Sequence, residues 1–167
     1  VIGDSTFFHA GMPGLLNIAY NDAKVCVVIL DNQVVAMTGH QPTPESGRRV
    51  TGEEAKIISI EGIAKALGID RVEIVDPYDV DETKKTIKSI LDYDGPSVII
   101  SKRPCVLLVK KGEIPRVMEE CNSCGVCIKL LGCPAISMTE EVVEIDPVLC
   151  TGCGICEVVC PYNAIRV

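Results

Sequence analysis

Residues 150–161 read CTGCGICEVVCP, and residues 121–134 read CNSCGVCIKLLGCP. The two stretches hold eight of the ten cysteines in the chain. When they are aligned, the first three cysteines of each stretch superpose at a constant offset of 29 residues, and proline follows each fourth cysteine. This internal repeat predicts two metal or cluster sites, because cysteines so closely spaced on one loop can bind one centre together.

The spacing within the repeat favours iron–sulfur clusters. The second stretch fits the C-x2-C-x2-C-x3-C-P pattern of bacterial ferredoxins, and the first stretch fits it with the last gap widened to five residues. Small or flexible residues at Ser123, Gly125, Gly152 and Gly154 would let the backbone wrap a cluster and direct amides at its sulfurs. We therefore predict two [4Fe-4S] clusters.

Resemblance to two-cluster ferredoxins implies that each fourth cysteine crosses over to the other cluster. The first cluster would then be bound by Cys121, Cys124, Cys127 and Cys160. The second would be bound by Cys150, Cys153, Cys156 and Cys133. Structural zinc is the alternative for such cysteine pairs.

The other two cysteines have no predicted function. Cys26 and Cys105 stand alone in apolar runs, where a cysteine usually packs as a small hydrophobic residue. A secreted disulfide scaffold is disfavoured, because Cys26 is the sole cysteine before residue 105. A reducing compartment, and hence a cytoplasmic location, is expected.

Composition narrows the class of protein further. The 167 residues are 47% hydrophobic and 23% charged, which is typical of a soluble globular chain. No run approaches the roughly 20 apolar residues of a membrane span, and no secretory signal is recognisable. The net charge of −7 argues against nucleic acid as a partner, because phosphate binding needs clustered Lys and Arg. We expect neither a membrane nor a nucleic-acid partner.

Two domains are predicted, residues 1–104 and 105–167. The first alternates strand-like and helix-like segments, which indicates an α/β fold with a parallel sheet. The apolar runs VCVVIL and VEIV predict strands buried on both faces, and helices are expected at residues 53–67 and 80–93. The second is predicted to be a small α+β ferredoxin-like domain with a hairpin in residues 135–146, stapled by its clusters.

The start of the chain predicts a site for a hard cation. Asp4 lies in GDSTFFHAG, and Asn32 follows an apolar strand 28 positions later. A carboxylate, an amide oxygen and a backbone carbonyl suit octahedral Mg²⁺ that also binds diphosphate oxygens. The diphosphate could meet amides around Ser5 and Thr6, with the following helix beginning near Met12.

This pairing resembles the metal-binding motif of thiamine diphosphate enzymes. With the cluster module downstream, the chain resembles 2-oxoacid:ferredoxin oxidoreductases, and GDSTFFHAGMPGL and LDNQVVAMTGHQPTP are most similar to the α subunits of indolepyruvate ferredoxin oxidoreductases. The resemblance implies Mg²⁺ bound by the side chains of Asp4 and Asn32 and the carbonyl of Val34. Around the diphosphate it implies Gly3, Ser5, Thr6, Thr38 and Gly39.

The resemblance also implies a function. Members of this family oxidatively decarboxylate aryl 2-oxo acids to acyl-coenzyme A, pass electrons through the clusters to an external ferredoxin, and act with a second (β) subunit. His9 and His40 flank the two motif segments and are candidate proton-transfer residues. Phe7 and Phe8 are the two phenylalanines of the chain. Burial preference favours packing of both between strand and helix, and at most one of them could line a pocket for an aryl group.

Two departures from the family bear on activity. Ser5 replaces the second glycine of the general motif, and neither the pyrimidine-binding domain nor the strand before the GDS motif is expected in these residues. We therefore expect a C-terminal fragment that is inactive alone. The alternatives are an electron-transfer or docking protein without chemistry of its own, and an oxidoreductase for another 2-oxo acid.

Overall fold

The computed structural model describes all 167 residues, which separate into two compact units. The first unit is Val1–Leu108 and the second is Val109–Val167. The boundary predicted between residues 104 and 105 lies four residues before this division.

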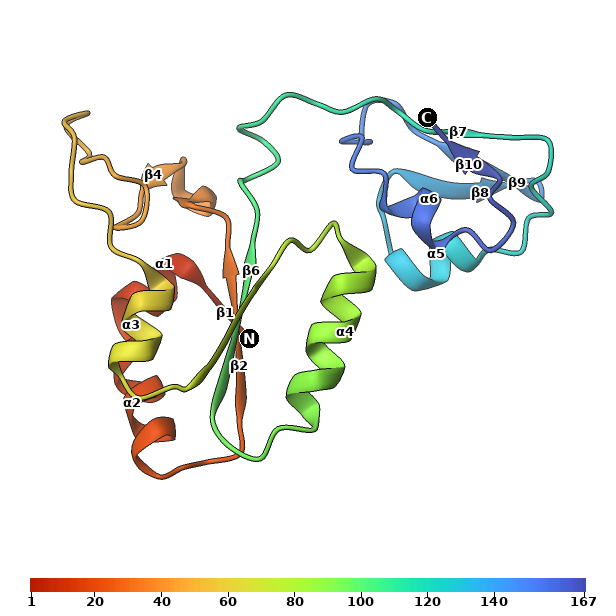
Figure 1. Cartoon of the computed structure of the whole chain (residues 1–167). Helices are drawn as coiled ribbons and strands as arrows, with labels where there is room; N and C mark the ends of the chain where they lie inside the picture. Colours follow the sequence, from red (N-terminus) through yellow and green to blue (C-terminus); the bar gives the residue numbers. More distant parts are fainter. The chain divides into compact units, whose positions relative to one another are not determined.

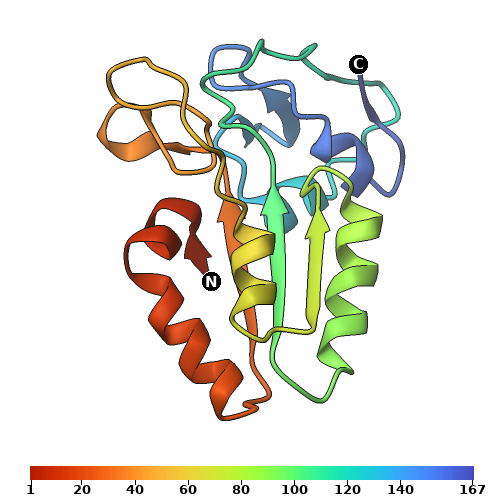
Figure 2. The ribbon, with the colours of Figure 1, turned by 60° about the vertical axis from the view of Figure 1, so that its left-hand side comes forward.

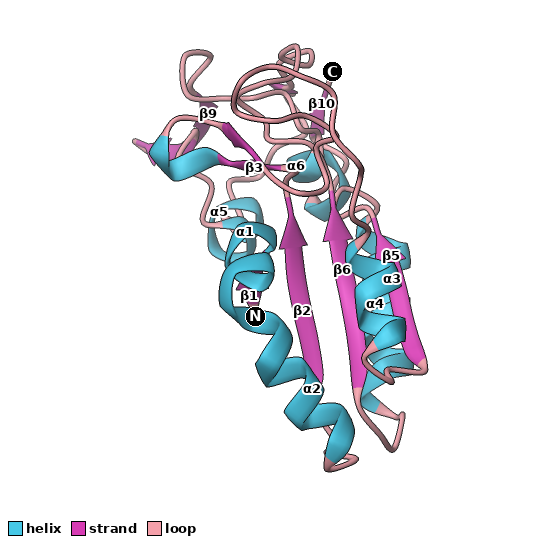
Figure 3. Ribbon diagram, turned by 90° about the vertical axis from the view of Figure 1, so that its left-hand side faces the viewer, coloured by secondary structure: helices cyan, strands magenta, loops and turns pink.

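A four-stranded parallel sheet forms the first unit. It contains β1 (Ile2–Gly3), β2 (Cys26–Asp31), β5 (Arg71–Val75) and β6 (Ser97–Lys102), in the spatial order β1-β2-β6-β5. All three pairings are parallel, so the strands end at the same edge of the sheet (Figures 2 and 3). The predicted α/β class is confirmed.

Helices cover both faces of this sheet (Figure 1). On one face, α2 (Met12–Tyr20) and α3 (Ile60–Ala66) pack on a core that includes Ile100. On the other face, α4 (Val80–Leu91) packs on a cluster that includes Ile99. The alternation follows from the strand geometry, because consecutive side chains point to opposite faces.

The start of the chain is helical earlier than predicted. Helix α1 (Asp4–Thr6) begins directly after β1, and a short π-helix, η1 (Phe7–Gly11), connects it to α2. The helix predicted to begin near Met12 is confirmed, and the helical turns of residues 4–11 before it were not predicted. The expected absence of a strand before the GDS motif is wrong, because Ile2 and Gly3 pair with β2.

The helix predicted at residues 53–67 is correct in its second half alone. The chain is helical from Ile60 to Ala66, and the Ser59 hydroxyl accepts the Gly62 N–H at 3.1 Å as the N-cap. The preceding residues form a folded-back loop, in which the Ala55 N–H donates to the Gly47 carbonyl at 2.9 Å. These loop bonds replace the helical ones, although the apolar spacing suited a helix.

Burial of the strands is less complete than predicted. The first four residues of β6 are buried, whereas Leu30 in β2 and Ile74 in β5 are each 49% exposed. Strand β5 is an edge strand, so fewer neighbours cover it. The prediction of strands buried on both faces is wrong for these positions.

The second unit is built from short elements. A hairpin occupies the predicted place, and left-handed φ angles of 50° at Glu140 and 66° at Glu141 form its two-residue turn. In a second antiparallel pair, a strand near the start of the unit pairs with a strand near its end. The elements in chain order are β7 (Arg116–Val117), α5 (Val126–Leu131), β8 (Ile136–Thr139), β9 (Val142–Ile145), α6 (Ile155–Val159) and β10 (Ile165–Arg166).

The internal repeat of the sequence is also a structural repeat. Gly125 and Gly154, with φ of 69° and 75°, immediately precede the equivalent helices α5 and α6. Ser123 and Gly152 have φ of 55° and 70° at equivalent positions. All four residues adopt the left-handed region that glycine tolerates best, which is consistent with the choice of small residues at these positions. No helix of the chain is long and apolar enough to cross a membrane.

The two sheet neighbours Ile100 and Ile74 give a test of the packing. Ile100 is 2% exposed and its register partner Ile74 is 49% exposed. We predict that Ile100→Ala lowers the free energy of unfolding by about 2–5 kcal/mol, because it leaves a cavity. Ile74→Ala should cost less than about 1 kcal/mol. Urea denaturation of the two variants, followed by circular dichroism, measures both, and equal losses would contradict the assigned core.

Candidate cofactor and cluster sites

Parallel pairing brings four polar residues to one edge of the first unit's sheet. Gly3 pairs with Leu30, so Asp4 follows β1 where Asp31 ends β2. Asp31 in turn pairs with Lys102, the last residue of β6. Asn32 follows directly. This is the edge where open parallel sheets usually bind ligands.

Asp4 is a buried carboxylate with one unused oxygen. Its residue is 3% exposed, and Oδ1 accepts the Ser5 N–H at 2.7 Å and the Ser5 hydroxyl at 3.3 Å. Oδ2 is buried without a hydrogen-bond partner. Burial raises the pKa of Asp4, and the charge of Asp31 adds to the increase, against the lowering by Ser5. A cation at Oδ2 would provide the missing partner and stabilise the ionised form.

Asn32 lies in a tight turn beside Asp4. Gln33 has a left-handed φ of 67°, and the Val34 N–H donates to the Asn32 Oδ1 at 3.0 Å. An amide oxygen has a second lone pair, so this bond leaves Asn32 able to bind a cation. Val34 begins β3 (Val34–Val35), which pairs with β4 (Gln41–Pro42).

The remaining predicted residues surround this edge less closely. Ser5 lies in α1 and has no left-handed φ, so the glycine of the general motif is not required there. Thr6 is exposed in the same helix. Thr38 ends η2 (Ala36–Thr38), and Gly39 follows with φ of 114°; both are exposed, and neither has a hydrogen bond to the residues at the sheet edge.

The two histidines differ in their surroundings. His9 is exposed in the π-helix η1. His40 is partly buried, has a φ of 62°, and its Nε2 lacks a hydrogen-bond partner. A catalytic role for either stays a prediction.

The phenylalanines pack mainly inside the first unit. Phe7 is 1% exposed and belongs to the core, and Phe8 packs against that core. Their rings meet edge to face with centroids 5.9 Å apart. Phe7 therefore serves the core, which leaves the partly exposed Phe8 as the candidate for a pocket wall.

Sequence reasoning missed a group of charged residues at the same edge, which we call the charge cluster. Lys102 Nζ lies 3.1 Å from Asp31 Oδ2 and 2.9 Å from Glu45 Oε1. Burial lowers the pKa of Lys102, but the two carboxylates outweigh it and the net shift is upward. Charged residues at the ends of two apolar strand runs were a signal for Asp31 and Lys102. Glu45 gave none, since it comes from a loop 57 residues before Lys102.

In the second unit, the cysteines line two separate cavities. Each cavity combines three cysteines of one sequence run with the fourth cysteine of the other run. No three His, Cys, Asp or Glu side chains converge closely enough to hold a single metal ion. One cavity is lined by Cys121, Cys124, Cys127 and Cys160, and the other by Cys133, Cys150, Cys153 and Cys156.

Neighbouring groups act on the buried thiols. Burial raises the pKa of Cys127, and the charges of Cys124 and Cys160 add to the increase. Burial, together with Cys153 and Cys150, raises the pKa of Cys156 to about 11. These thiols resist ionisation by themselves, so a bound metal would have to stabilise their thiolates.

Backbone amides also approach the sulfur atoms. The Gly152 N–H donates to Cys150 Sγ at 3.4 Å, and the Ala164 N–H donates to Cys160 Sγ at 3.3 Å. Such hydrogen bonds tune the potential of a thiolate-bound cluster. The cysteines and amides present fit iron–sulfur clusters.

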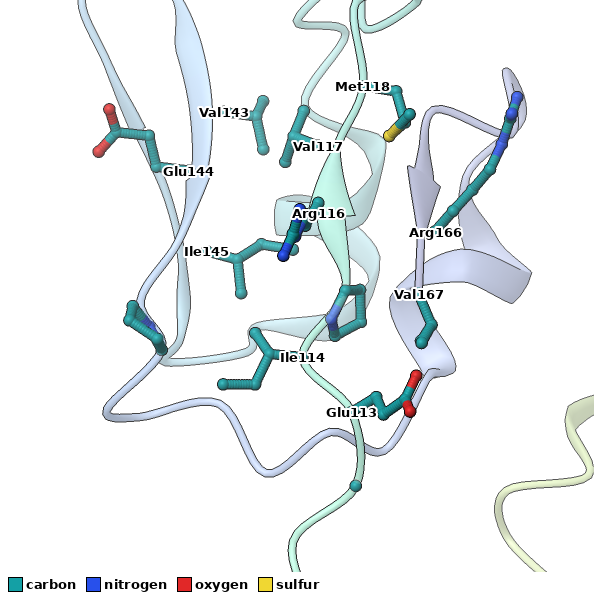
Figure 4. A pocket seen from close by; sticks show the side chains of 13 residues that line it. Glu113, Ile114, Arg116, Val117, Met118, Val143, Glu144, Ile145, Arg166 and Val167 are labelled. Carbon is teal, nitrogen blue, oxygen red and sulfur yellow. The ribbon is translucent and has the colours of Figure 1, made fainter.

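A groove that the sequence did not reveal lies against one cysteine cavity. Figure 4 shows that Ile114, Arg116 and Ile145 face its hollow, whereas the Glu144 side chain points away. Ile145 and Pro115 line both the groove and the cavity of Cys133. The groove and this cavity therefore share a wall.

The fold and the two kinds of site define a thiamine diphosphate-binding domain joined to an iron–sulfur module. Residues 1–101 match the family described as "Thiamine pyrophosphate enzyme, C-terminal TPP binding domain". Residues 143–166 match the family described as "4Fe-4S binding domain". The chain belongs to the thiamine pyrophosphate enzyme family.

Curated relatives confirm the resemblance to indolepyruvate oxidoreductases. The chain is 47% identical over 174 residues to "Indolepyruvate oxidoreductase subunit IorA" of Pyrococcus horikoshii. This match covers 98% of this chain and 27% of the relative. The chain is 42% identical over 172 residues to the protein of that name from Archaeoglobus fulgidus, covering 99% and 28%. The chain thus spans little more than a quarter of the length of the curated relatives it matches, and corresponds to their C-terminal portion.

A solved structure supports the fold. The 2-oxoglutarate:ferredoxin oxidoreductase from Magnetococcus marinus superposes with a TM-score of 0.59 at 17% sequence identity. The match covers 80% of this chain and 52% of that chain. At 17% sequence identity, the similarity between the two proteins shows a shared fold alone.

Double variants can test which cysteines share a cluster. We predict about eight iron atoms per chain in anaerobically prepared protein and about four after Cys160→Ala. Adding Cys124→Ala should leave about four, because both residues line one cavity. Combining Cys160→Ala with Cys153→Ala should instead remove nearly all the iron, because these two residues line different cavities. Iron and zinc analysis together with the visible absorption spectrum measures this.

The control for this test is Cys26→Ala, which changes a cysteine outside both cavities and should leave the iron content unchanged. If the Cys160→Ala, Cys124→Ala variant loses nearly all its iron, the crossed pairing is wrong. Zinc in place of iron in protein from its native source would favour the structural zinc alternative.

Proposed function

We propose that this chain is the cofactor and electron-transfer portion of an enzyme that oxidatively decarboxylates aryl 2-oxo acids to acyl-coenzyme A. Electrons would pass through two [4Fe-4S] clusters to an external ferredoxin, in a complex with a second subunit in the cytoplasm. The observation that carries the proposal is the presence, in one chain, of a buried carboxylate with an unpaired oxygen at a parallel sheet edge and of two cavities lined by four cysteines each.

The sheet edge fits Mg²⁺ and a diphosphate. Asp4 would bind the cation through its unpaired Oδ2, with Asn32 Oδ1 and the Val34 carbonyl as further ligands. Gly3, Ser5, Thr6, Thr38 and Gly39 are proposed to surround the diphosphate. When bound, thiamine diphosphate supplies the nucleophilic carbon that allows a 2-oxo acid to lose carbon dioxide. The chain's own contribution is to bind and orient the cofactor.

The two cysteine sets would bind one cluster each, with Cys160 and Cys133 crossing over. The buried thiols and the amides directed at Cys150 and Cys160 are suited to clusters that carry single electrons. A reducing compartment would keep these thiols available. An electron carrier or docking protein without its own chemistry would need the clusters but not the polar residues of the sheet edge.

The substrate class rests on the relatives rather than on the phenylalanines. Six curated relatives at 42–47% identity carry the name indolepyruvate oxidoreductase subunit. Phe7 is committed to the core, so it offers no wall to an aryl group. Coenzyme A and the second subunit are proposed from the family resemblance.

Cofactor binding tests the role of Asp4. In the complete polypeptide assembled with its partner subunit, Asp4→Ala should abolish Mg²⁺-dependent binding of thiamine diphosphate, because it removes the charged ligand. Isothermal titration calorimetry measures the affinity, with Asp22→Ala at an exposed turn as the control. Equal affinities in Asp4→Ala and the parent would contradict the proposed metal site.

Substrate preference tests the aryl assignment. The assembled enzyme should oxidise indolepyruvate or phenylpyruvate with a kcat/KM at least about tenfold above pyruvate and 2-oxoglutarate, a difference of roughly 1.4 kcal/mol in transition-state binding. Initial rates of ferredoxin-linked dye reduction with the four acids provide the comparison. A preference for pyruvate or 2-oxoglutarate would instead place the enzyme with another 2-oxo acid.

A further inference from the structure

The charge cluster of Asp31, Glu45 and Lys102 lies beside Asp4 but is outside the proposed ligand set; Asp31 is buried, and Glu45 and Lys102 are partly buried. The Asp31 side chain is 0% exposed, that of Glu45 is 9% and that of Lys102 is 33%. Burial of ionised groups carries a desolvation penalty, and buried ion pairs seldom stabilise a fold more than apolar packing does. The cluster therefore calls for a role other than stability.

The contacts of Asp31 connect this cluster to the proposed cation ligands. Its Oδ2 is the oxygen paired with Lys102, and its Oδ1 accepts the Gln33 N–H at 3.1 Å. Gln33 is the residue between Asn32 and Val34. Gly3 pairs with Leu30, so the turn that follows Asp31 begins beside Asp4.

Other groups hold the turn from its remaining sides. The Thr43 hydroxyl donates to the Gln33 carbonyl at 3.4 Å, and Thr43 is 4% exposed. The carbonyls of Asp31 and Asn32 accept the N–H groups of Arg103 at 3.0 Å and Cys105 at 3.1 Å. These contacts retain Gln33 in a left-handed conformation that is unfavourable for a residue other than glycine.

The charge count at this edge suits a divalent cation. Fully ionised, Asp4, Asp31 and Glu45 would carry three negative charges against the one positive charge of Lys102, which leaves −2. Lys102 Nζ forms an ion pair with one oxygen of Asp31 and one of Glu45, whereas no cation of the chain pairs with Asp4. Asp31 Oδ2 and Glu45 Oε2, like Asp4 Oδ2, have no hydrogen-bond partner. A divalent cation would balance the charge and would bind at Asp4 rather than at Asp31.

We propose that Asp31, held by Lys102 and Glu45, is a positioning residue that fixes the turn of Asn32 and Val34 around a divalent cation at Asp4. This inference rests on the proposed function, because the cation is the one expected with thiamine diphosphate. Asp31 acts through the Gln33 N–H and does not bind the cation. Glu45 acts through Lys102, and Thr43 supports the same turn from its carbonyl side.

Binding of Mn²⁺ in the presence of thiamine diphosphate tests the inference in the complete polypeptide assembled with its partner subunit. The signal of free Mn²⁺ in electron paramagnetic resonance gives the dissociation constant without any turnover. We expect Asp31→Ala and Lys102→Met each to weaken Mn²⁺ binding about 10–100-fold, the usual effect of removing an outer-shell partner. Asp31→Asn should recover part of the loss, because it keeps an oxygen for the Gln33 N–H.

A double variant separates positioning from independent effects. If Asp31 and Lys102 act as one unit, Asp31→Ala with Lys102→Met should bind Mn²⁺ within about threefold of either single variant. Unchanged affinity in Asp31→Ala, or losses that multiply in the double variant, would overturn the inference. The matched control is Asp94→Ala, which removes an aspartate from an exposed ion pair with Lys24 and should bind Mn²⁺ like the parent.

Thr43→Val provides a second test if Asp31→Ala does not fold. It preserves the size of the side chain and removes the hydroxyl bound to Gln33, so several-fold weaker Mn²⁺ binding is expected, and parental affinity would overturn the inference. Far-ultraviolet circular dichroism and iron content report folding. If the parent itself does not bind Mn²⁺ with thiamine diphosphate, the proposed function fails and the inference with it; if the parent binds and the variants match it, the inference alone fails.

Discussion

Parallel pairing of β1, β2 and β6 is the constraint on which the chemistry of the first unit depends. Parallel strands end at one edge, so their following residues meet although long segments of chain separate them. Asp4, Asn32 and Lys102 come together by this means. A slip of one residue between β2 and β6 would move Lys102 away from Asp31 and turn the core residues to the wrong face. Core packing therefore also sets the geometry of the edge.

The buried and partly buried carboxylates at that edge are of two kinds. Asp31 and Glu45 are compensated within the chain by Lys102, whereas Asp4 has an oxygen without a partner. All three carboxylates have an oxygen without a hydrogen-bond partner, but of the three Asp4 alone also lacks an ion pair, which indicates where a cation is expected. The distribution of partners thus separates the residue proposed to bind the cation from those proposed to position it.

The second unit depends on its cysteines in a different way. Cys127 and Cys156 belong to its small core, together with Ile136, Val143 and Ile165. A unit of this size has little apolar area to bury, and clusters bound by the cysteines would add links between the two halves of the repeat. Folding and cluster binding would then be coupled, since each proposed ligand set takes one cysteine from the other half.

The sequence by itself determined the α/β class, the hairpin, the repeat of the cysteine runs and the family, because these depend on local pattern and spacing. It did not determine that residues 53–59 fold back instead of forming a helix, or that Leu30 is half exposed. Only the tertiary structure decided the charge cluster, because Glu45 reaches Lys102 from a loop whose position depends on hydrogen bonds such as that between Ile58 and Pro44. Contacts between residues distant in sequence follow from tertiary packing, and the hydrophobic periodicity of the sequence does not predict them.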